Sequence, residues 1–430
     1  MRLLIKNGRV LDPSNGLDEI MDIYMENSEI VQIEKDIDLS GVDIEIIDAT
    51  GLTVAPGLVD MHCHLREPGY EYKEDIESGT KSAAMGGFTS IACMPNTNPV
   101  IDNGAMVSYI INKAREVGAV NVYPIGTITK GLKGEELAEI GEMKFAGVVA
   151  VSDDGRPVES PAIMRNALKY AAMFDTPVIS HCEELSLVQG GALNEGYMST
   201  YMGLKGISRA SEELMVSREA ILSLTYQVPV HIAHVSTRNS VEIIRHAKAQ
   251  GAPITCETCP HYFTLTEEAA GEFDTNAKMN PPLRTADDVQ AIIEGLKDGT
   301  IDAIATDHAP HHPDEKNVEF AKAANGIVGF ETALSLGVTY LVKAGHLTMA
   351  QLIEKMSVNP AQILGLNKGQ IKVGKNADLV IIDENKKRTV ETDKFLSKSK
   401  NSPYNGYELS GTVEYTIVNG HLVVRQGILL

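Results

Sequence analysis

The middle of the chain alternates apolar, β-branched runs with helical patterns, and short connections join them. This alternation predicts βαβ units, because two parallel strands need a crossover segment between them. The helical patterns cover, for example, residues 76–85, 106–117, 162–174 and 241–249. Eight strand and helix units over roughly 300 residues are typical of a (β/α)8 barrel, so we predict an α/β fold of the TIM type. The candidate strands are 53–64, 88–95, 120–128, 145–154, 177–183, 228–235, 252–263 and 302–310.

The two ends of the chain have a different texture from the middle. Short β-rich runs separated by turns fill residues 1–54, and the same pattern returns in residues 367–430. We therefore predict that both termini form one small, discontinuous β-sandwich domain, with the barrel of residues 55–366 inserted between its halves.

Charge and composition exclude several classes of partner. The net charge of -20, from 58 acidic against 38 basic residues, disfavours nucleic acid and anionic membrane surfaces. No apolar leader opens the chain, and no run approaches the roughly 20 apolar residues of a spanning helix. We expect a cytoplasmic protein without a membrane partner.

Five cysteines in 430 residues form no dense framework, which suits a reducing compartment without structural disulfides. One Cys-x-x-Cys pair occurs, at Cys256 and Cys259, and a single such pair is a weak zinc signal. We interpret both cysteines as buried residues at a strand end.

A His-x-His pair, His62 and His64, lies at the carboxyl end of the first candidate strand. On a helix the two side chains would point about 200° apart, whereas on a strand residues i and i+2 share a face. The pair could therefore hold one metal ion. The carboxyl ends of the strands are also where α/β barrels carry their active sites.

Other strands place polar residues at the same rim of the predicted barrel. The fourth candidate strand ends in Asp153 and Asp154, and Asp307 follows the eighth. His181 and His234 lie at the ends of the fifth and sixth. Imidazole and carboxylate groups suit zinc or a similar divalent ion. There are enough of them for two ions that share a bridging carboxylate.

Five stretches of the chain are long and specific motifs: residues 56–69, 94–99, 152–155, 278–284 and 305–311. In these stretches, and nearly end to end, the chain resembles the dihydroorotases of the type I branch of the amidohydrolase superfamily. That resemblance implies a zinc-dependent cyclic amidohydrolase that interconverts N-carbamoyl-L-aspartate and L-dihydroorotate in de novo pyrimidine biosynthesis. It further implies a homodimer and a possible partner, aspartate carbamoyltransferase.

The resemblance also implies roles for the ligand residues. His62 and His64 would bind one zinc ion, His181 and His234 a second, and Asp307 would be both a terminal ligand and the catalytic proton carrier. Many amidohydrolases use a carboxylated lysine as the bridge, but residues 147–154 contain no lysine. We therefore assign the bridge to Asp154, with Asp153 as the alternative, and expect one or two Zn²⁺ ions per subunit.

The substrate contacts are carried over in the same way. Arg66 offers a planar, two-pronged donor for the substrate carboxylate, which a lysine could not copy. The stretch 308–330 is longer than an ordinary connection and is a candidate lid. The full set of substrate-binding residues that the resemblance implies is His64, Arg66, Asn96, Asn280, His311, Asn325 and Gly326.

Two other functions compete with this interpretation. Another cyclic-amide hydrolase, such as an allantoinase or hydantoinase, would not need Arg66 and Asn96, because a hydantoin lacks the carboxylate that they suit. A non-catalytic homologue, kept as a scaffold for aspartate carbamoyltransferase, would be expected to have lost metal ligands. In this chain, every ligand position holds a histidine or an aspartate that can bind a metal ion.

Overall fold

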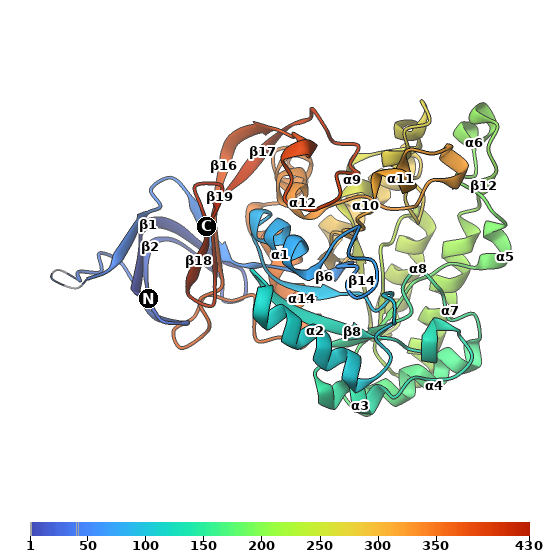
Figure 1. Ribbon diagram of the computed structural model, residues 1–430, viewed down its shortest axis with the longest axis horizontal. Coiled ribbons are helices and arrows are strands. Elements are labelled where there is room, and N and C mark those ends of the chain that lie inside the picture. Colours follow the sequence, from blue (N-terminus) through green and yellow to red (C-terminus); the bar gives the residue numbers. More distant parts are fainter. Residues whose placement is uncertain (1, 40, 42) are drawn as a thin grey trace.

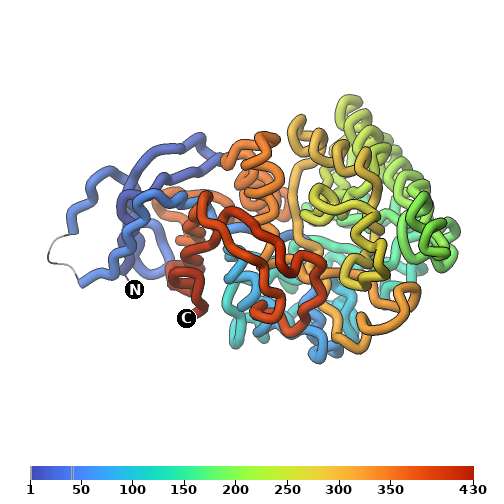
Figure 2. Tube along the Cα trace, turned by 90° about the horizontal axis from the view of Figure 1, so that it is seen from above, coloured from blue at the N-terminus to red at the C-terminus, as the bar shows by residue number. Residues whose placement is uncertain are grey.

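The computed structural model describes residues 2–39, 41 and 43–430. Figure 1 shows a strand-rich part that carries both chain ends and a larger part in which helices surround a parallel sheet. Figure 2 shows that a segment of the C-terminal region, drawn in red, runs back over the larger part.

Within the described residues, the larger part is built on an eight-stranded parallel sheet. Its ends come together through a parallel bridge between Cys63 and His308, where the His64 amide donates to the His308 carbonyl at 2.9 Å. The predicted (β/α)8 barrel is confirmed. Its strands, in order, are β6 (Leu58–Cys63), β7 (Phe88–Cys93), β8 (Asn121–Gly126), β9 (Ala150–Ser152), β10 (Val178–Ser180), β13 (Val230–Ile232), β14 (Ile254–Thr258) and β15 (Ala303–Ile304).

Several outer helices begin at residues whose side chains satisfy free amides of the first turn. Asp75 and Asn103 accept from first-turn amides of the helices that they cap, and Ser160 does so directly before a proline. Apolar side chains from these helices pack on the sheet in one continuous core. The helices are α1 (Ile76–Met85), α2 (Gly104–Val117), α3 (Ile140–Ala146), α4 (Pro161–Ala172), α7 (Ala210–Tyr226), α8 (Arg238–Ala249), α10 (Ala286–Asp298) and α12 (Phe330–Gly337).

Short elements interrupt the connections at the rim and after the last strand. A two-stranded sheet and two short helices follow β10, and a short helix follows β14. The candidate lid contains one turn of α-helix and one of 3-10 helix. The short elements of the rim connections are α5 (Leu185–Val188), β11 (Leu193–Asn194), α6 (Tyr197–Met202), β12 (Gly206–Ile207) and α9 (Pro260–Thr264). Those of the candidate lid are α11 (Pro313–Lys316) and η4 (Phe320–Lys322), and α13 (Met349–Ile353) and α14 (Asn359–Ile363) follow later in the chain.

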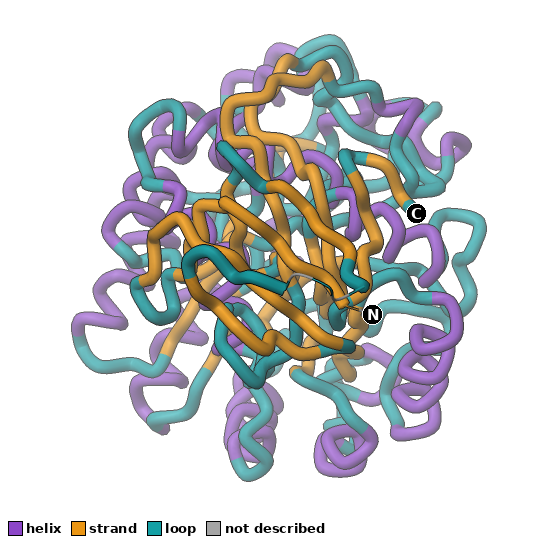
Figure 3. Tube along the Cα trace, turned by 90° about the vertical axis from the view of Figure 1, so that its left-hand side faces the viewer, coloured by secondary structure: helices purple, strands orange, loops and turns teal. Residues whose placement is uncertain are grey.

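The chain ends combine in a second sheet, in which nine strands lie within the described residues. Figure 3 shows its strands in front of the barrel, with N and C nearby. The two halves join where β5 pairs with β16, and residues from both halves fill one apolar core. Its strands are β1 (Arg2–Asp12), β2 (Leu17–Glu26), β3 (Glu29–Glu34), β4 (Glu45–Asp48), β5 (Thr53–Pro56), β16 (Leu379–Thr389), β17 (Glu408–Val418), β18 (His421–Arg425) and β19 (Ile428–Leu429).

The first candidate strand, 53–64, is two strands in the structure. Its first part is β5 of the terminal sheet, and its second part is β6 of the barrel. The division falls at Gly57, where a Cβ atom would lie 2.2 Å from the Thr89 side chain. β5 thus extends two residues past the expected boundary at residue 54. The division into domains remains a prediction.

The strand predicted over 252–263 also ends early. β14 stops at Thr258 because Cys259 begins a short helix that has Pro260 in its first turn. All five cysteines are buried and carry free thiols. Over residues 2–39, 41 and 43–430, no helix combines the length and apolarity needed to cross a membrane.

Candidate active site

A cavity of about 210 Å³ opens at the carboxyl ends of the barrel strands. Five of the six predicted metal ligands, all except His62, and all of the predicted substrate-binding residues line it. The volume suits a small polar molecule better than a drug-sized ligand. The lining residues are His64, Arg66, Asn96, Asp154, Gly155, His181, His234, Asn280, Asp307, Ala309, His311, Asn325 and Gly326.

His62 and His64 project from the end of β6 toward two carboxylates. His64 Nε2 lies 3.2 Å from Asp307 Oδ1 and 3.5 Å from Asp154 Oδ2. His62 Nε2 lies 3.4 Å from Asp154 Oδ1 and 3.6 Å from Asp307 Oδ1. The pair thus meets both carboxylates from one side.

Asp154 and Asp153 have different partners, although they are adjacent. Asp153 Oδ1 accepts from the amides of Ile128 and Thr129 at 2.7 and 3.1 Å, so its carboxylate supports a neighbouring loop. Asp154 instead faces the histidines at the cavity floor. The geometry therefore favours Asp154 over Asp153 as the bridging carboxylate.

The other two predicted histidine ligands come from neighbouring strands, β10 and β13. His181 Nδ1 lies 2.8 Å from His234 Nε2, and both atoms lie within 3.7 Å of Asp154 Oδ1. On its far side, His181 Nε2 lies 3.1 Å from Glu183, which also accepts from Asn280. Asp154 therefore lies between two pairs of histidines.

Two buried atoms at this centre show that it fits a metal ion. His62 Nε2 and Asp154 Oδ1 have no hydrogen-bond partner among the described residues. Buried polar atoms are rarely left unsatisfied without a missing ion or water. Ligand atoms of His62, His64 and Asp307, and those of His62, Asp154 and His234, lie within 4.8 Å of one another. The donors are the nitrogen and oxygen atoms that zinc accepts.

The electrostatics favour positive charge at the same point. Burial acts to raise the pKa of Asp154, but His62, His181 and His234 outweigh it and hold that pKa well below its usual range. Burial also acts to raise the pKa of Asp307, and His62 and His64 again hold it low. Both carboxylates are therefore ionised and available as ligands.

Glu257 is a functional candidate that the sequence reasoning missed. Its Oε1 lies 2.6 Å from His62 Nδ1, and its Oε2 lies 3.3 Å from His231. A carboxylate on the remote nitrogen fixes the tautomer and orientation of a metal-binding histidine. The available signal was a carboxylate within the candidate strand 252–263, and in the structure Glu257 is fully buried in β14.

The cationic side of the cavity carries Arg66. Its Nε donates to the Pro310 carbonyl at 3.2 Å, and its terminal nitrogen lies 3.4 Å from His311 Nε2. In the described part of the chain these contacts leave the guanidinium without a carboxylate ion pair. Arg66 can therefore bind an anion in the cavity with a planar, two-pronged donor.

His311 is held beside that guanidinium as a neutral group. Its Nε2 donates to the Asn325 carbonyl at 2.7 Å. Burial, reinforced by the charge of Arg66, lowers the pKa of His311 to about 3. Asn96, which also lines the cavity, accepts through Oδ1 from His64 Nδ1 at 3.0 Å. The predicted anchors thus surround one space between Arg66 and the metal ligands.

The C-terminal region contributes Asn401, a second residue that the sequence reasoning missed. Asn401 Oδ1 accepts from the His311 amide at 3.1 Å. Its Nδ2 donates to the carbonyls of Ala309 and Gly326 at 3.1 and 3.0 Å. One buried side chain thus braces both segments that carry the substrate side of the cavity.

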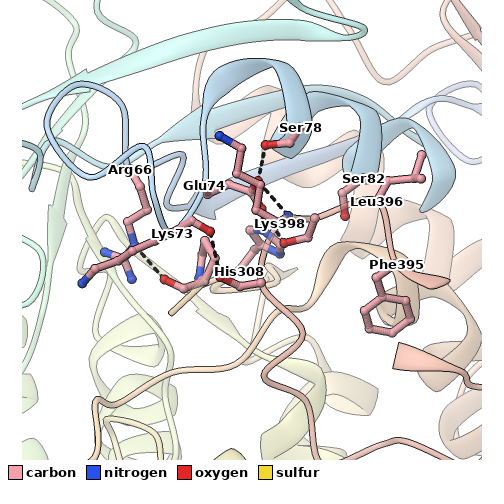
Figure 4. A network of polar contacts seen from close by, with 12 residues as sticks. Arg66, Lys73, Glu74, Ser78, Ser82, His308, Phe395, Leu396 and Lys398 are labelled. Atoms are coloured by element: carbon pink, nitrogen blue, oxygen red, sulfur yellow. Dashed lines mark hydrogen bonds and ion pairs between the residues drawn. The ribbon is translucent and has the colours of Figure 1, made fainter. Parts of the chain in front are cut away.

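Neighbouring residues of the same region attach to the barrel through Glu74, as Figure 4 shows. Glu74 accepts from the Lys398 amide at 3.1 Å and from the Ser397 hydroxyl, and it lies 3.4 Å from His308 Nε2. The His308 ring in turn accepts from the Gly329 amide at 3.1 Å. Hydrogen bonds to Glu74 therefore join the segment between β16 and β17 to the barrel.

Comparison with known proteins agrees with this description. Residues 51–240 match the family described as Dihydro-orotase-like, and residues 236–424 match the Amidohydrolase family. The barrel and the ligand set at its rim thus define the chain as an amidohydrolase.

Full-length relatives specify the family further. The dihydroorotase of Acetivibrio thermocellus is 65% identical over 428 residues, which cover 100% of both chains. That of Ruminiclostridium cellulolyticum is 63% identical over 430 residues, again 100% of both. The chain belongs to the dihydroorotase family. The prediction of an enzyme, a cyclic amide hydrolase, is confirmed.

Solved structures share the architecture at lower identity. The L-hydantoinase (dihydropyrimidinase) of Arthrobacter aurescens has a TM-score of 0.89 and 27% identity, covering 100% of this chain and 97% of that one. The dihydropyrimidinase of Brevibacillus agri has a TM-score of 0.86 and 23% identity, with 100% and 96% covered, which shows the fold alone.

Proposed function

We propose that this enzyme interconverts N-carbamoyl-L-aspartate and L-dihydroorotate, the reaction that names its family. The observation that carries the proposal is the Arg66 guanidinium, which has no carboxylate partner among the described residues and lies in the same 210 Å³ cavity as the metal ligands. Dihydroorotate bears a carboxylate beside the cyclic amide that must be opened. The cavity offers a binding group for each of these two parts.

His62, His64 and Asp307 would hold one zinc ion, and His181 and His234 a second, with Asp154 between the two. When bound, zinc polarises a carbonyl oxygen and activates water at neutral pH. The orphaned His62 and Asp154 atoms support this assignment. Glu257 would keep His62 in the tautomer that presents Nε2 to the metal.

Asp307 is proposed as the proton carrier between water and the ring nitrogen. Its Oδ1 lies 3.2 Å from His64 Nε2, and the residue lines the cavity. As a carboxylate it accepts a proton during ring opening, and as a carboxylic acid it donates one during closure. One group at this position can therefore act in both directions.

The substrate would lie with its carboxylate on Arg66, Asn96 and His311. Its ring edge would face Asn280 and the backbone groups of Asn325 and Gly326. His64, between Asn96 and Asp307, connects the two halves of the site.

The zinc requirement, a homodimer, an aspartate carbamoyltransferase partner and a cytoplasmic location also remain proposals. The last three rest on the resemblance and on composition. Light scattering of the purified protein, and copurification with the transferase, would test the assembly.

The direct test is an assay of purified, metal-analysed protein against L-dihydroorotate, hydantoin, allantoin and dihydrouracil. We expect kcat/KM for dihydroorotate to exceed that for each uncharged ring by at least about 100-fold. A hydrogen-bonding or charged site rejects ligands that leave its groups unpaired by comparable factors. Equal or higher efficiency with hydantoin or dihydrouracil would favour the hydantoinase-like alternative instead.

A further inference from the structure

A third group of metal-ligating side chains lies beside the site described above. Ligand atoms of Cys259, His261 and Asp307 all lie within 4.8 Å of one another, and the three residues are 0%, 2% and 8% exposed. Only Asp307 belongs to the proposed zinc sites. The other two residues have no part in the proposed reaction.

The local fold explains why these residues meet. β14 and β15 are paired in parallel, and the Ala305 amide donates to the Thr258 carbonyl at 3.0 Å. Cys259 and Asp307 therefore leave adjacent strands at the same end of the barrel. Pro260 turns the chain into α9, which places His261 within reach of both.

His261 provides an independent indication of a ligand. Its Nε2 is buried and has no hydrogen-bond partner among the described residues. An unpartnered, buried imidazole is unusual for a residue with a purely packing role.

The other cysteine of the Cys-x-x-Cys pair, Cys256, takes no part in this group. Cys256 Sγ donates to the Thr300 carbonyl at 3.3 Å, and residue 256 packs in the main barrel core. The pair is thus not a two-thiol zinc motif. Cys259 alone faces Asp307 and His261.

We propose that Cys259, His261 and Asp307 form an inhibitory site for a thiophilic divalent cation such as Cd²⁺ or excess Zn²⁺. Thiolate, imidazole and carboxylate together are ligands of such ions. Metal bonds of about 2.0–2.3 Å place three evenly spread ligands of one ion about 3.3–4.0 Å from one another. The observed ligand atoms lie within 4.8 Å of one another, so they need to approach by no more than about 1.5 Å to share an ion.

Occupation of this site would withdraw Asp307 from the reaction. Coordination by sulfur releases the thiol proton to solvent, and the ion then shares or captures the Asp307 carboxylate. Asp307 could no longer exchange a proton with the substrate. The inhibition, but not the binding of the cation, rests on the proposed function of Asp307.

The test is a Cd²⁺ titration of the zinc-loaded enzyme with three readouts. These are the cadmium–thiolate absorption in the ultraviolet, the zinc and cadmium content of the protein, and the rate of dihydroorotate hydrolysis relative to each variant's own uninhibited rate. Cys259→Ser removes the proposed sulfur ligand, and Cys256→Ser is the matched control three residues earlier, in β14. His261→Asn tests the site from its other side.

We expect wild type and Cys256→Ser to show the thiolate band, to bind additional cadmium while retaining zinc, and to be inhibited. Cys259→Ser should lack the band and need at least about tenfold more Cd²⁺ for the same inhibition, since even residues behind a ligand contribute roughly 10–100-fold to affinity. His261→Asn should also weaken binding.

Equal inhibition of wild type and Cys259→Ser, or displacement of zinc without a thiolate band, would overturn the proposal. If Cys259→Ser does not fold, unchanged cadmium affinity in His261→Asn would overturn it as well. The absorption and metal content need no activity. A protein that failed to hydrolyse dihydroorotate would therefore still test the metal site.

Discussion

Glu257 holds His62 by a 2.6 Å contact between its Oε1 and the imidazole Nδ1, although the two residues are 195 positions apart. Burial acts to raise the pKa of Glu257, but His62 and His231 outweigh it and lower that pKa to about 2. The carboxylate is therefore ionised throughout the working pH range. It can fix His62 with its remote nitrogen protonated and Nε2 facing the carboxylates of the site.

Glu257→Gln should therefore weaken zinc binding by roughly 10–100-fold, because the charge behind the ligand is lost while the side-chain shape is kept. Competition with a chelator would measure the affinity. Glu267→Gln is the control, since Glu267 is also buried but accepts from Asn194 away from the metal ligands. Unchanged zinc affinity in Glu257→Gln would show that His62 needs no such partner.

The two adjacent aspartates should separate metal binding from stability. Asp154→Ala should lower the metal content and remove most activity. Asp153→Ala should retain metal but lower the free energy of unfolding by about 1–3 kcal/mol, because buried amides of Ile128 and Thr129 lose their acceptor. Metal analysis and denaturant unfolding of both variants would measure the metal content and the free energy of unfolding. The reverse pattern would show that Asp153, not Asp154, is the bridging carboxylate.

Arg66→Lys should keep the metal and raise KM for dihydroorotate by about 10–100-fold. A charged hydrogen bond is worth about 1.5–3 kcal/mol, and lysine loses the two-pronged geometry. Steady-state kinetics would measure the change. Arg165→Lys, at a half-buried arginine of α4 that contacts Asn166 and does not line the cavity, is the control. A KM within twofold of wild type would remove Arg66 as the carboxylate anchor.

Asn401→Ala should raise KM more than it lowers kcat, because it releases His311 and Gly326 while leaving the metal ligands in place. Each buried group left unpaired costs about 1–3 kcal/mol, so an increase of at least about tenfold is expected. Asn405→Ala, in the same segment but bonded to Thr392, is the control. Equal effects of the two changes would indicate a role in stability alone.

Asp307→Asn should slow both directions by at least about 100-fold, the usual size of a general acid–base contribution. In the wild type, the low pKa of Asp307, held down by His62 and His64 against the effect of burial, keeps it ionised at neutral pH. Hydrolysis should rise with pH and level off, and synthesis should rise as pH falls. Initial rates with metal content checked at each pH would test this. If the variant keeps its metal and loses less than tenfold in activity, another group, such as His311, must carry the proton.

The sequence by itself determined the barrel and the rim on which the site lies. Alternation of strands and helices is a local property, and so is the period of two that places His62 and His64 on one face. The carboxyl ends of parallel strands meet at one edge. For this reason His181, His234 and Asp307 could be assigned to a common site before any contact was known.

Only the tertiary structure decided how those residues are supported. Asp153 and Asp154 differ by one position, and the local pattern does not determine which of the two carboxylates accepts hydrogen bonds from a neighbouring loop. Asn401 meets His311 across 90 residues, and Glu257 meets His62 across 195. Periodicity carries no information at such separations, because these contacts depend on how the strands are ordered in the barrel and on where the terminal sheet packs against its rim.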